Sequence, residues 1–387
     1  MAGRKRVLVV QAAISPKGGG HLVAAWALQA LRKTWDVSLA TLRPIDYSAV
    51  NRSFGTSLKE GDVDVRVAPP SYQHILRWMP TAGALLERSL VVRFAQDLDR
   101  REKYDLLFST QNEVDFHRRG LQYIHYPATY LPRPENEMRW FHQIPGVHSA
   151  YIAFCDRVQR ATQDGFGRNL TLANSRFVAN RFRELYGTDA IIVYPPVPGD
   201  FPEVPWHERR AGFVAAGRLD ELKRWHVAVS IIEEVRRRGH EISFTLIGQP
   251  DHPPYERHLQ SLAATRPWFR MLKDLSREQL TVEMAQHRYG MHTMEEEHFG
   301  IAPAEIQRAG CITFVHNSGG PREIVGEHPR LVFDSAEEAA DKITGVLTDP
   351  LIEESLRAHV ARQRERFSVD AFCASIRENV DGFDYGN

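Results

Sequence analysis

Two carboxylates eight residues apart lie on either side of a Phe-Gly turn in the last third of the chain. Glu297 precedes Phe299 and Gly300, and Glu305 follows them. The pattern predicts a turn after a strand and then a short helix that ends at Gly310. Backbone N–H groups at such a helix start point outward, and the helix dipole favours an anion there. We expect Glu305, about one turn into the helix, to reach the vicinal hydroxyls of a ribose, while Glu297 is aimed at a sugar.

The residues around these carboxylates carry a family signature. Their spacing resembles the E-x7-E motif of retaining GT-B glycosyltransferases, and especially the dolichol-pathway α-1,2-mannosyltransferases, in which His-Thr-Met precedes the motif. The matching strings are His292-Thr293-Met294, Glu297-His298-Phe299-Gly300-Ile301 and His316-Asn317-Ser318-Gly319-Gly320-Pro321. The resemblance places Phe299, Gly300 and Ile301 in the donor-binding turn. A solvated acidic run is the alternative for any one of the glutamates, but not for the whole string.

Arg218 and Lys223 form a second candidate group in the same half of the chain. Arg218 lies at the end of a predicted strand, and Lys223 follows five residues later at the start of a helix. The resembled family uses such a pair to neutralise the donor diphosphate. Fixed cations beside a developing phosphate charge stabilise the transition state more than the ground state. An exposed basic turn is the alternative.

Two candidates lie in the first half of the chain. Gly18, Gly19 and Gly20 link the first strand to the first helix, where glycines let the backbone approach a ligand closely. In the resembled family this loop lies across the cleft from the donor diphosphate and shapes the acceptor side. His125 belongs to a His-Tyr-Pro string that the mannosyltransferases share, and the resemblance implies a contact with the donor sugar. A flexible turn and a structural histidine are the respective alternatives.

These residues need elements that bring them together, and strand-like and helix-like segments alternate along the chain. Strands are predicted at residues 6–11, 37–42, 104–109, 121–125, 169–173, 190–194, 212–216, 242–247, 289–294 and 311–316. Helices are predicted at residues 21–35, 225–238, 277–287 and 369–381. Such alternation implies parallel sheets with right-handed crossovers. We therefore predict an α/β GT-B fold, in which two Rossmann-like doubly wound domains face each other across a cleft.

A proline-rich segment at residues 194–199 marks the expected domain junction. Residues 1–195 would form the N-terminal, acceptor-side domain. Residues 196–365 would form the C-terminal domain that binds the nucleotide sugar, and residues 366–387 a helix that crosses back to the N-terminal domain. Ligands are expected outside the carboxyl ends of the strands, where the motifs fall.

The composition excludes several functional classes. The 387 residues carry a net charge of zero, so the chain as a whole lacks a nucleic-acid footprint. Cys155, Cys311 and Cys373 lie too far apart for a CxxC zinc site or a disulfide framework. The sequence shows no signal peptide and no apolar run of membrane-spanning length, so we expect a cytoplasmic protein.

Two DxD strings are candidates for a metal-dependent donor site. Asp62 and Asp64 lie in a polar connection, and Asp97 and Asp99 lie in the charged tail of a helix. Neither string follows a convincing buried strand, so both are interpreted as solvated. We expect no metal and no cofactor, with the nucleotide-diphosphate sugar as co-substrate.

The sequence thus predicts retaining transfer of a hexose, preferably mannose, from GDP-mannose or a UDP-sugar. The acceptor would be a hydroxyl of a glycan, a lipid-linked or glycolipid acceptor, or a small molecule. The N-terminal membrane anchor normal in the resembled mannosyltransferases has no counterpart here, which puts the lipid-linked acceptor in doubt. Two alternatives remain: a nucleotide-sugar epimerase of GT-B fold, and a catalytically silent module that binds nucleotide.

The segment 72–96 is a candidate surface for contact with a membrane. It is unusually apolar, and residues 1–120 carry 18 Lys and Arg against 12 Asp and Glu. A peripheral contact with the inner face of an anionic membrane would use such a surface. An ordinary pair of core-facing helices, split at Pro80, is the favoured alternative. The apolar residues of segment 72–96 are Ile75, Leu76, Trp78, Met79, Leu85, Leu86, Leu90, Val91, Val92 and Phe94.

Overall fold

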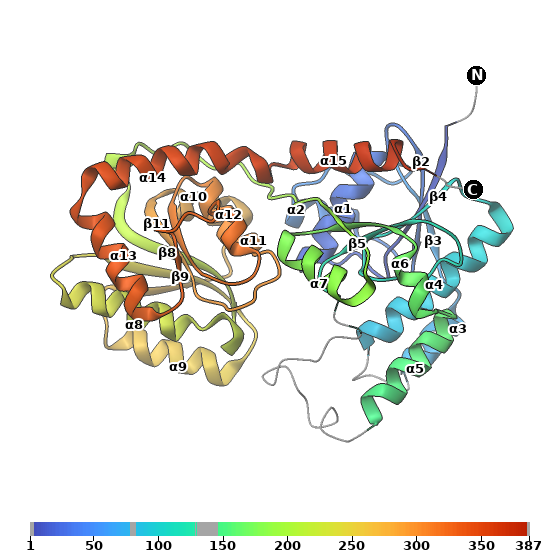
Figure 1. Ribbon diagram of the computed structural model, residues 1–387, viewed down its shortest axis with the longest axis horizontal. Coiled ribbons are helices and arrows are strands. Elements are labelled where there is room, and N and C mark those ends of the chain that lie inside the picture. Colours follow the sequence, from blue (N-terminus) through green and yellow to red (C-terminus); the bar gives the residue numbers. More distant parts are fainter. Residues whose placement is uncertain (1–3, 78–82, 128, 130–145, 385–387) are drawn as a thin grey trace. The chain divides into compact units, whose positions relative to one another are not determined.

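The computed structural model describes residues 4–77, 83–127, 129 and 146–384 (Figure 1). The chain divides into two compact units. Unit 1 comprises Met1–Pro196 and Val369–Asn387, and unit 2 comprises Val197–Ser368. Each unit has its own parallel sheet and its own buried core.

Unit 1 contains a seven-stranded parallel sheet in the order β3-β2-β1-β4-β5-β6-β7. Its strands are β1 (Arg6–Val10), β2 (Asp36–Thr41), β3 (Asp64–Val67), β4 (Leu106–Ser109), β5 (Leu121–Ile124), β6 (Leu170–Ala173) and β7 (Ile191–Ile192). Its helices are α1 (Gly19–Leu31), α2 (Tyr47–Phe54), α3 (Pro70–Arg77), α4 (Gly83–Glu102), α5 (Val147–Gln159), α6 (Gln163–Gly167), α7 (Arg176–Tyr186) and α15 (Val369–Asp381). The strand order reverses between β1 and β4, which makes their carboxyl ends the switch point of this sheet.

The C-terminal helix α15 packs within unit 1 beside α1. The Trp35 indole N–H donates a 2.7 Å hydrogen bond to Asp381 Oδ1, and the Phe372 ring meets Tyr123 edge-on at 6.4 Å. Because these contacts join α15 to the residue before β2 and to β5, α15 is an integral part of unit 1.

Helix α4 is also part of that core. Its apolar residues Leu86, Leu90, Val91, Val92 and Phe94 are buried against β1 and β2. The favoured interpretation of core-facing packing therefore holds for α4. The side chains of Ile75, Trp78 and Met79 lie outside the described residues. None of the helices in the described part of the chain is long and apolar enough to span a bilayer.

A buried ion pair fixes α4 to the segment after β4. Arg88 donates a 3.1 Å hydrogen bond to Glu113, whose side chain is fully buried, and a 2.6 Å hydrogen bond to Thr129 Oγ1. The Tyr186 hydroxyl donates to the other Glu113 oxygen at 3.4 Å. With its charge neutralised inside the unit, Arg88 is not available to a membrane surface.

Unit 2 contains a six-stranded parallel sheet in the order β10-β9-β8-β11-β12-β13. Its strands are β8 (Arg210–Leu219), β9 (Ser243–Pro250), β10 (Phe269–Lys273), β11 (His287–His292), β12 (Ile312–His316) and β13 (Val332–Phe333). Its helices are α8 (Trp225–Arg237), α9 (Pro253–Ala264), α10 (Arg277–Ala285), α11 (Ile301–Arg308), α12 (Pro321–Ile324), α13 (Ala336–Thr348) and α14 (Pro350–Gln363). Short 3-10 turns are η3 (Trp206–Glu208), η4 (Glu221–Lys223) and η5 (Arg364–Phe367).

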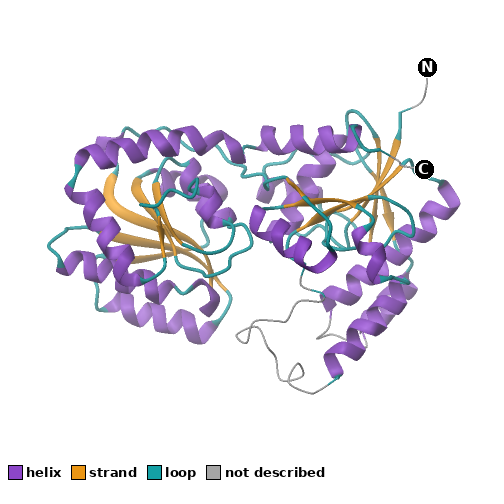
Figure 2. Ribbon diagram, in the orientation of Figure 1, coloured by secondary structure: helices purple, strands orange, loops and turns teal. Residues whose placement is uncertain are grey.

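Helices cover both faces of the unit 2 sheet (Figure 2). Side chains alternate between the faces of a strand, so Phe213 and Ala215 of β8 pack in one core cluster and Val214 and Ala216 in another. The first cluster includes residues of α8, α9 and α13, and the second includes residues of α10 and α11. Burial on both faces explains the apolar run from Phe213 to Ala216 in the central strand β8.

The predicted pair of parallel α/β sheets is confirmed, but three strands were missed. These are β3, β10 and β13, and each lies at the edge of its sheet. β3 and β10 are partly exposed and contain charged residues, whereas β13 is buried but only two residues long. None of the three contains an apolar run long enough to indicate a strand.

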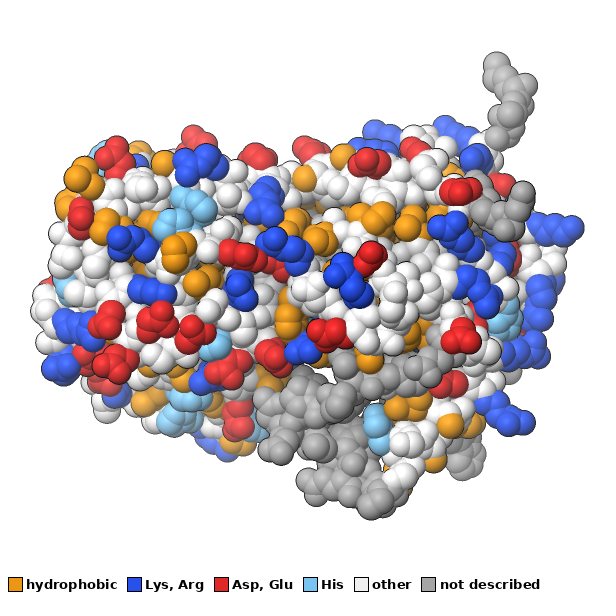
Figure 3. Space-filling model, viewed as in Figure 1, with side chains coloured by type: hydrophobic (Ala, Val, Ile, Leu, Met, Phe, Trp, Pro, Cys, Tyr) orange, Lys and Arg blue, Asp and Glu red, His pale blue; other side chains and the backbone are white. Residues whose placement is uncertain are grey.

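The two units differ in the charged side chains that they present in the view of Figure 3. Acidic and basic side chains are interspersed on the visible face of unit 2, and Lys and Arg side chains follow one edge of unit 1.

The cysteines Cys155, Cys311 and Cys373 are buried free thiols.

The buried Arg88–Glu113 pair yields a stability prediction. Glu113→Ala leaves the Arg88 charge buried without its partner and is expected to reduce the free energy of unfolding by about 3–5 kcal/mol. The matched control is Glu184→Ala, which removes a carboxylate from the exposed Arg181–Glu184 pair and should cost less than about 1 kcal/mol. Urea denaturation of both variants measures the difference, and equal losses would contradict a structural role for the buried pair.

Candidate functional site

The sequence motifs of unit 2 meet at the carboxyl edge of its sheet. β8 and β11 are neighbours at the point where the strand order reverses, and β12 lies next to β11. Arg218 lies at the end of β8, and the segments that follow the three strands contain Asp220 to Lys223, Thr293 to Gly300, and Asn317 to Gly320. In open parallel sheets this edge, at the switch point, is where ligands bind.

An ion pair between Lys223 and Glu297 links the first two loops. The Lys223 ammonium donates directly to Glu297 Oε2, and both side chains are more than four-fifths buried. Lys223 is held there by η4, where the Asp220 carboxylate caps the turn by accepting from the Lys223 backbone N–H at 3.1 Å. Burial raises the pKa of the Glu297 carboxyl, but the Lys223 ammonium outweighs it and brings the pKa down to about 2. Glu297 is therefore an anion throughout the physiological pH range.

His292 lies directly behind this pair, at the end of β11. Its side chain is buried, and its Nε2 is 3.6 Å from Glu297 Oε2. Burial lowers the pKa of His292 to about 3, and the nearby Lys223 charge acts in the same direction. The imidazole is consequently neutral at physiological pH.

Hydrogen bonds and close backbone packing join the loops after β11 and β12. The Ser318 hydroxyl accepts from the Glu296 backbone N–H at 2.8 Å and contacts His316 Nδ1 at 2.8 Å. The Gly320 N–H donates to the Glu297 carbonyl at 2.8 Å. A Cβ on Gly319, which has a φ of +70°, would lie 2.3 Å from that carbonyl oxygen. Gly319 and Gly320 thus allow the two loops to touch. Their contacts fix the backbone that carries Glu297.

The loop after β8 is joined to the same framework. The Thr293 hydroxyl donates to the carbonyls of Lys223 and Arg224 at 2.8 and 3.1 Å, and Arg224 forms an ion pair with Glu295. These contacts fix the relative positions of Lys223 and Glu297 through the backbone as well as through their side chains.

Arg218 lies at the end of β8 and is half exposed. Its guanidinium forms ion pairs with Asp220 at 3.0 Å and with Asp251 at 2.8 Å. The preceding Gly217 has a φ of +154°, and a Cβ there would lie 3.1 Å from the Trp225 ring. Arg218 and Lys223 are therefore both present at the carboxyl edge, and both are neutralised by carboxylates of this chain.

Glu305 is the fifth residue of α11 and is buried. It forms an ion pair with Arg277 at the start of α10, and Arg277 also donates to the Pro198 carbonyl. Gly300 caps α11 with a φ of +94°, Ile301 is its first residue, and the Phe299 ring is buried against Phe367 at 5.7 Å. The predicted turn and helix are present, with the Phe299 side chain anchoring the turn.

The candidates of unit 1 lie together at the carboxyl edge of its own sheet. Gly18 caps α1 with a φ of +98°, and Gly19 and Gly20 begin the helix. A Cβ on Gly20 would lie 3.4 Å from His125 Nε2, so the glycine turn and His125, just after β5, are neighbours. His125 Nε2 donates to the Thr110 carbonyl at 2.9 Å, which orients the imidazole.

The DxD carboxylates are engaged by arginines. Asp62 pairs with Arg32, Asp64 with Arg66 at 2.8 Å, Asp97 with Arg93 at 3.4 Å, and Asp99 with Arg118 at 2.9 Å. Within the described residues, no three His, Cys, Asp or Glu side chains converge as a metal site would require.

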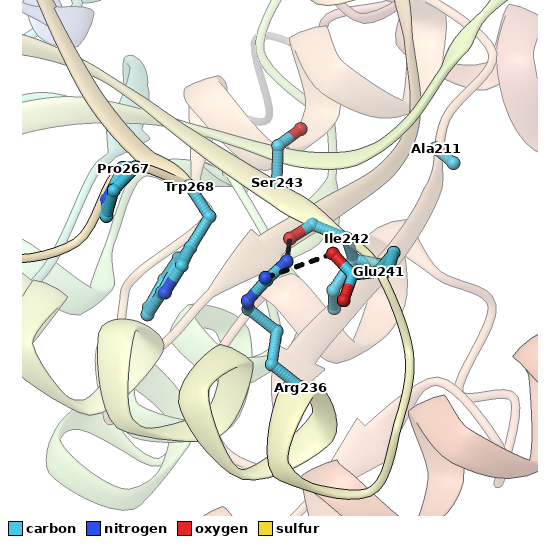
Figure 4. A pocket seen from close by; sticks show the side chains of 7 residues that line it. All are labelled: Ala211, Arg236, Glu241, Ile242, Ser243, Pro267 and Trp268. Carbon is cyan, nitrogen blue, oxygen red and sulfur yellow. Dashed lines mark hydrogen bonds and ion pairs between the residues drawn. The ribbon is translucent and has the colours of Figure 1, made fainter.

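A hollow of about 470 Å³ lies elsewhere on unit 2 (Figure 4). It is lined by Ala211, Arg236, Glu241, Ile242, Ser243, Pro267 and Trp268. Arg236 donates to the Ile242 carbonyl at 2.6 Å and to Glu241 at 3.1 Å, and its guanidinium lies 5.6 Å from the Trp268 ring centre. Apart from Arg236 of α8, the lining residues lie at or just before the amino ends of β8, β9 and β10, so the hollow is at the opposite edge of the sheet from Glu297.

Sequence reasoning missed the residues that support the predicted ones. His292, Thr293 and Ser318 belong to the quoted motifs without an assigned role, and Arg277 lay outside them. Arg277 carries no sequence signal, because its contact with Glu305 spans 28 residues and depends on how α10 packs beside α11.

The architecture belongs to the GT-B class. The chain superposes on the Anabaena Alr3699/HepE structure in complex with UDP and glucose with a TM-score of 0.67, at 15% identity, covering 98% of this chain and 100% of that one. It superposes equally well on WaaG, a glycosyltransferase involved in lipopolysaccharide biosynthesis, with a TM-score of 0.67 and 14% identity over 97% and 100% of the two chains. Likeness at this identity shows the fold, and the predicted GT-B class is confirmed.

Residues 199–366, most of unit 2, match the family of glycosyl transferases group 1. The chain is 26% identical over 238 residues to the Mus musculus GDP-Man:Man(3)GlcNAc(2)-PP-Dol alpha-1,2-mannosyltransferase, over 54% of this chain and 48% of that protein. It is 21% identical over 308 residues to the Mus musculus alpha-1,3/1,6-mannosyltransferase ALG2, over 68% of each chain. The chain spans about half the length of the α-1,2-mannosyltransferase. The resemblance to dolichol-pathway mannosyltransferases is confirmed.

The contact between Gly319 and Glu297 yields a test of the loop framework. Gly319→Ala places a Cβ against the Glu297 carbonyl in a left-handed conformation and is expected to cost at least about 1–2 kcal/mol of stability. The matched control is Gly345→Ala within α13, where a Cβ meets nothing within 4 Å. That change should stabilise by roughly 0.5–1 kcal/mol, because alanine favours a helix. Denaturant melts with the same sign for both variants would refute this account of the loop.

The neutral state of His292 yields a pH prediction. Its folded-state pKa, about 3, lies below the ordinary value of about 6.5 for an unfolded histidine. Protonation therefore favours the unfolded chain, and stability is lost as pH falls below about 6.5. Between pH 7 and pH 5 this one group should cost about 2 kcal/mol. We expect His292→Gln to lose less stability than the wild type over that interval, and parallel pH curves for the two proteins would contradict the assignment.

Proposed function

We propose that this chain is a retaining glycosyltransferase that moves a hexose, preferably mannose, from a nucleotide-diphosphate sugar to a hydroxyl acceptor. The observation that carries the proposal is the arrangement at the carboxyl edge of unit 2, where Lys223 pairs with Glu297 beside Arg218. This edge lies within the part of the chain that matches the glycosyl transferases group 1. The relative with the α-1,2-mannosyltransferase name uses GDP-mannose, which makes GDP-mannose the first donor to test.

Each residue takes a role that its chemistry supports. Arg218 and Lys223 bind the donor diphosphate and stabilise the negative charge that develops on the leaving phosphate. Glu297 accepts hydrogen bonds from hydroxyls of the transferred sugar. Glu305 accepts from the ribose hydroxyls, through the oxygen that does not bond Arg277. The backbone N–H groups at Phe299, Gly300 and Ile301 face the phosphate from the start of α11.

Ligand binding must then replace ion pairs that exist in the free protein. Arg218 has to leave Asp220 or Asp251, and Lys223 has to turn its ammonium from Glu297 toward a phosphate. A diphosphate offers several strong acceptor oxygens, so the exchange keeps each cation neutralised. The same two cations supply the positive charge that a divalent metal gives to the diphosphate in other enzymes, and we infer that transfer requires no metal.

We propose that unit 1 binds the acceptor near Gly18 to Gly20 and His125, which lie at the edge of its sheet. Glycans that end in mannose are the first acceptors to test, free and lipid-linked, because the α-1,2-mannosyltransferase relative acts on a Man(3)GlcNAc(2) chain carried by PP-Dol. We infer a cytoplasmic location, with access to a lipid-linked acceptor from the membrane surface.

The experiment that tests the proposal has two stages. Thermal unfolding with GDP, UDP or ADP identifies the base, since a ligand at 100 times its Kd adds about 2.7 kcal/mol of stability. The matching sugar donor is then incubated with mannose-terminated acceptors in the presence of EDTA. We expect an α-linked product from an α-linked donor, determined by proton NMR of the first-formed glycoside. A β-linked product would overturn retention. Turnover without an acceptor would favour an epimerase, and nucleotide binding with no turnover would favour a silent module.

The proposed binding of the diphosphate by Arg218 and Lys223 is tested by removing each cation in turn. Arg218→Ala and Lys223→Ala should each lower kcat/KM for the donor by roughly 10²–10³, the range for loss of one preorganised charge-stabilising donor. Lys342→Ala on α13 is the matched control, since it also removes a lysine from an ion pair, with Glu338. The control should retain wild-type kcat/KM. Wild-type turnover in the Arg218 or Lys223 variant would show that this residue does not bind the diphosphate.

A further inference from the structure

His292 offers the least explained polar group beside the candidate site. It lies at the carboxyl end of β11 with a side chain that is only 2% exposed. Its Nε2 is buried and makes no hydrogen bond to any described residue. A buried nitrogen without a partner is costly, so its presence here calls for an explanation.

The group that faces this nitrogen is Glu297. Nε2 lies 3.6 Å from Glu297 Oε2, the same oxygen that accepts from Lys223. An ionised carboxylate can only accept, so the tautomer that matches it is the neutral imidazole with its proton on Nε2. Closing the gap to an ordinary hydrogen bond needs a movement of roughly half an ångström.

The surroundings keep His292 in that neutral form and in that orientation. The Trp225 ring packs edge-on against the imidazole at 6.1 Å, and the strand backbone fixes its Cα. Lys223 and His316 are the cationic or titratable neighbours, Glu297 is the anionic one, and burial with the Lys223 charge lowers the pKa of the imidazole. A second cation next to Lys223 would compete with it, whereas a neutral N–H donor does not.

We propose that His292 is a positioning residue that holds Glu297 when a diphosphate draws Lys223 away from it. The inference rests on the proposed function, in which Lys223 binds the donor diphosphate. In the free protein Lys223 compensates the Glu297 charge. When its ammonium turns toward phosphate, Glu297 moves by a fraction of an ångström and accepts from His292 Nε2–H. Glu297 thereby stays ionised and aimed at the sugar throughout transfer.

Two variants separate this role from packing. His292→Phe keeps a ring against Trp225 and removes the donor, whereas His292→Gln retains an N–H donor near the position of Nε2. For the donor sugar we expect His292→Phe to lower kcat by about 10–100-fold with KM changed less than about threefold, because the contact forms only after Lys223 engages phosphate. His292→Gln should restore kcat to within about fivefold of the wild type. Wild-type kcat in His292→Phe, or equal losses in both variants, would overturn the proposal.

A spectroscopic measurement tests it without turnover. Protein labelled with ¹⁵N-histidine is titrated with GDP, and the resonance missing from His292→Gln identifies the residue. We expect the His292 Nε2–H proton to move downfield and exchange more slowly when GDP is bound, and to show neither change in Glu297→Ala. GDP binding that leaves this proton unchanged would overturn the role of His292 and leave the proposed function intact. Failure of GDP, UDP and ADP alike to bind would instead overturn the proposed function, and this inference with it.

Discussion

The Lys223–Glu297 ion pair is the constraint on which the rest of unit 2 depends. Two opposite charges that are largely removed from water must stay together, because either one alone would lose its solvation without compensation. The pair therefore requires the loops after β8 and β11 to meet at one place. The hydroxyl of Thr293, the cap from Asp220 and the close approach of Gly319 all serve that meeting.

Parallel strands make this arrangement possible. All six strands of the unit 2 sheet point the same way, so the loops that follow β8, β11 and β12 emerge at one edge. Reversal of the strand order between β8 and β11 separates the crossover helices there and leaves room for a ligand. Unit 1 repeats the principle between β1 and β4, beside the glycine turn and His125.

The free protein keeps its cations neutralised in advance. Arg218 is paired with two aspartates, Lys223 with Glu297, and Arg277 with Glu305. In the proposed function, an anionic ligand binds by exchange of partners rather than by filling an uncompensated positive pocket. Such a site would discriminate by geometry as well as by charge, since a ligand must reach both cations to replace the carboxylates as their partners. The proposed role of His292 follows from this exchange, because Glu297 then needs a new hydrogen-bond donor.

The sequence by itself determined the class of fold and supplied the candidates for the principal site residues. Central strands such as β1 and β8 contain apolar runs because both of their faces are buried, and this pattern can be recognised without a structure. The spacing of Glu297 and Glu305 and the glycine at position 300 are local features, so helix α11 and its cap were predictable as well. The edge strands β3, β10 and β13 were not predicted, because β3 and β10 carry charged residues on partly exposed positions and β13 has only two residues.

Only the tertiary structure decided which partners these residues have. That Lys223 contacts Glu297, that Arg277 neutralises Glu305 and that Arg88 is buried against Glu113 are contacts across 74, 28 and 25 residues. The unbonded His292 nitrogen is likewise visible only once β11 is placed beside β8. Local sequence fixes propensity and periodicity, but a pair of distant side chains meets only where packing brings their elements together. The electrostatics of the site therefore belong to the fold rather than to any single segment of the chain.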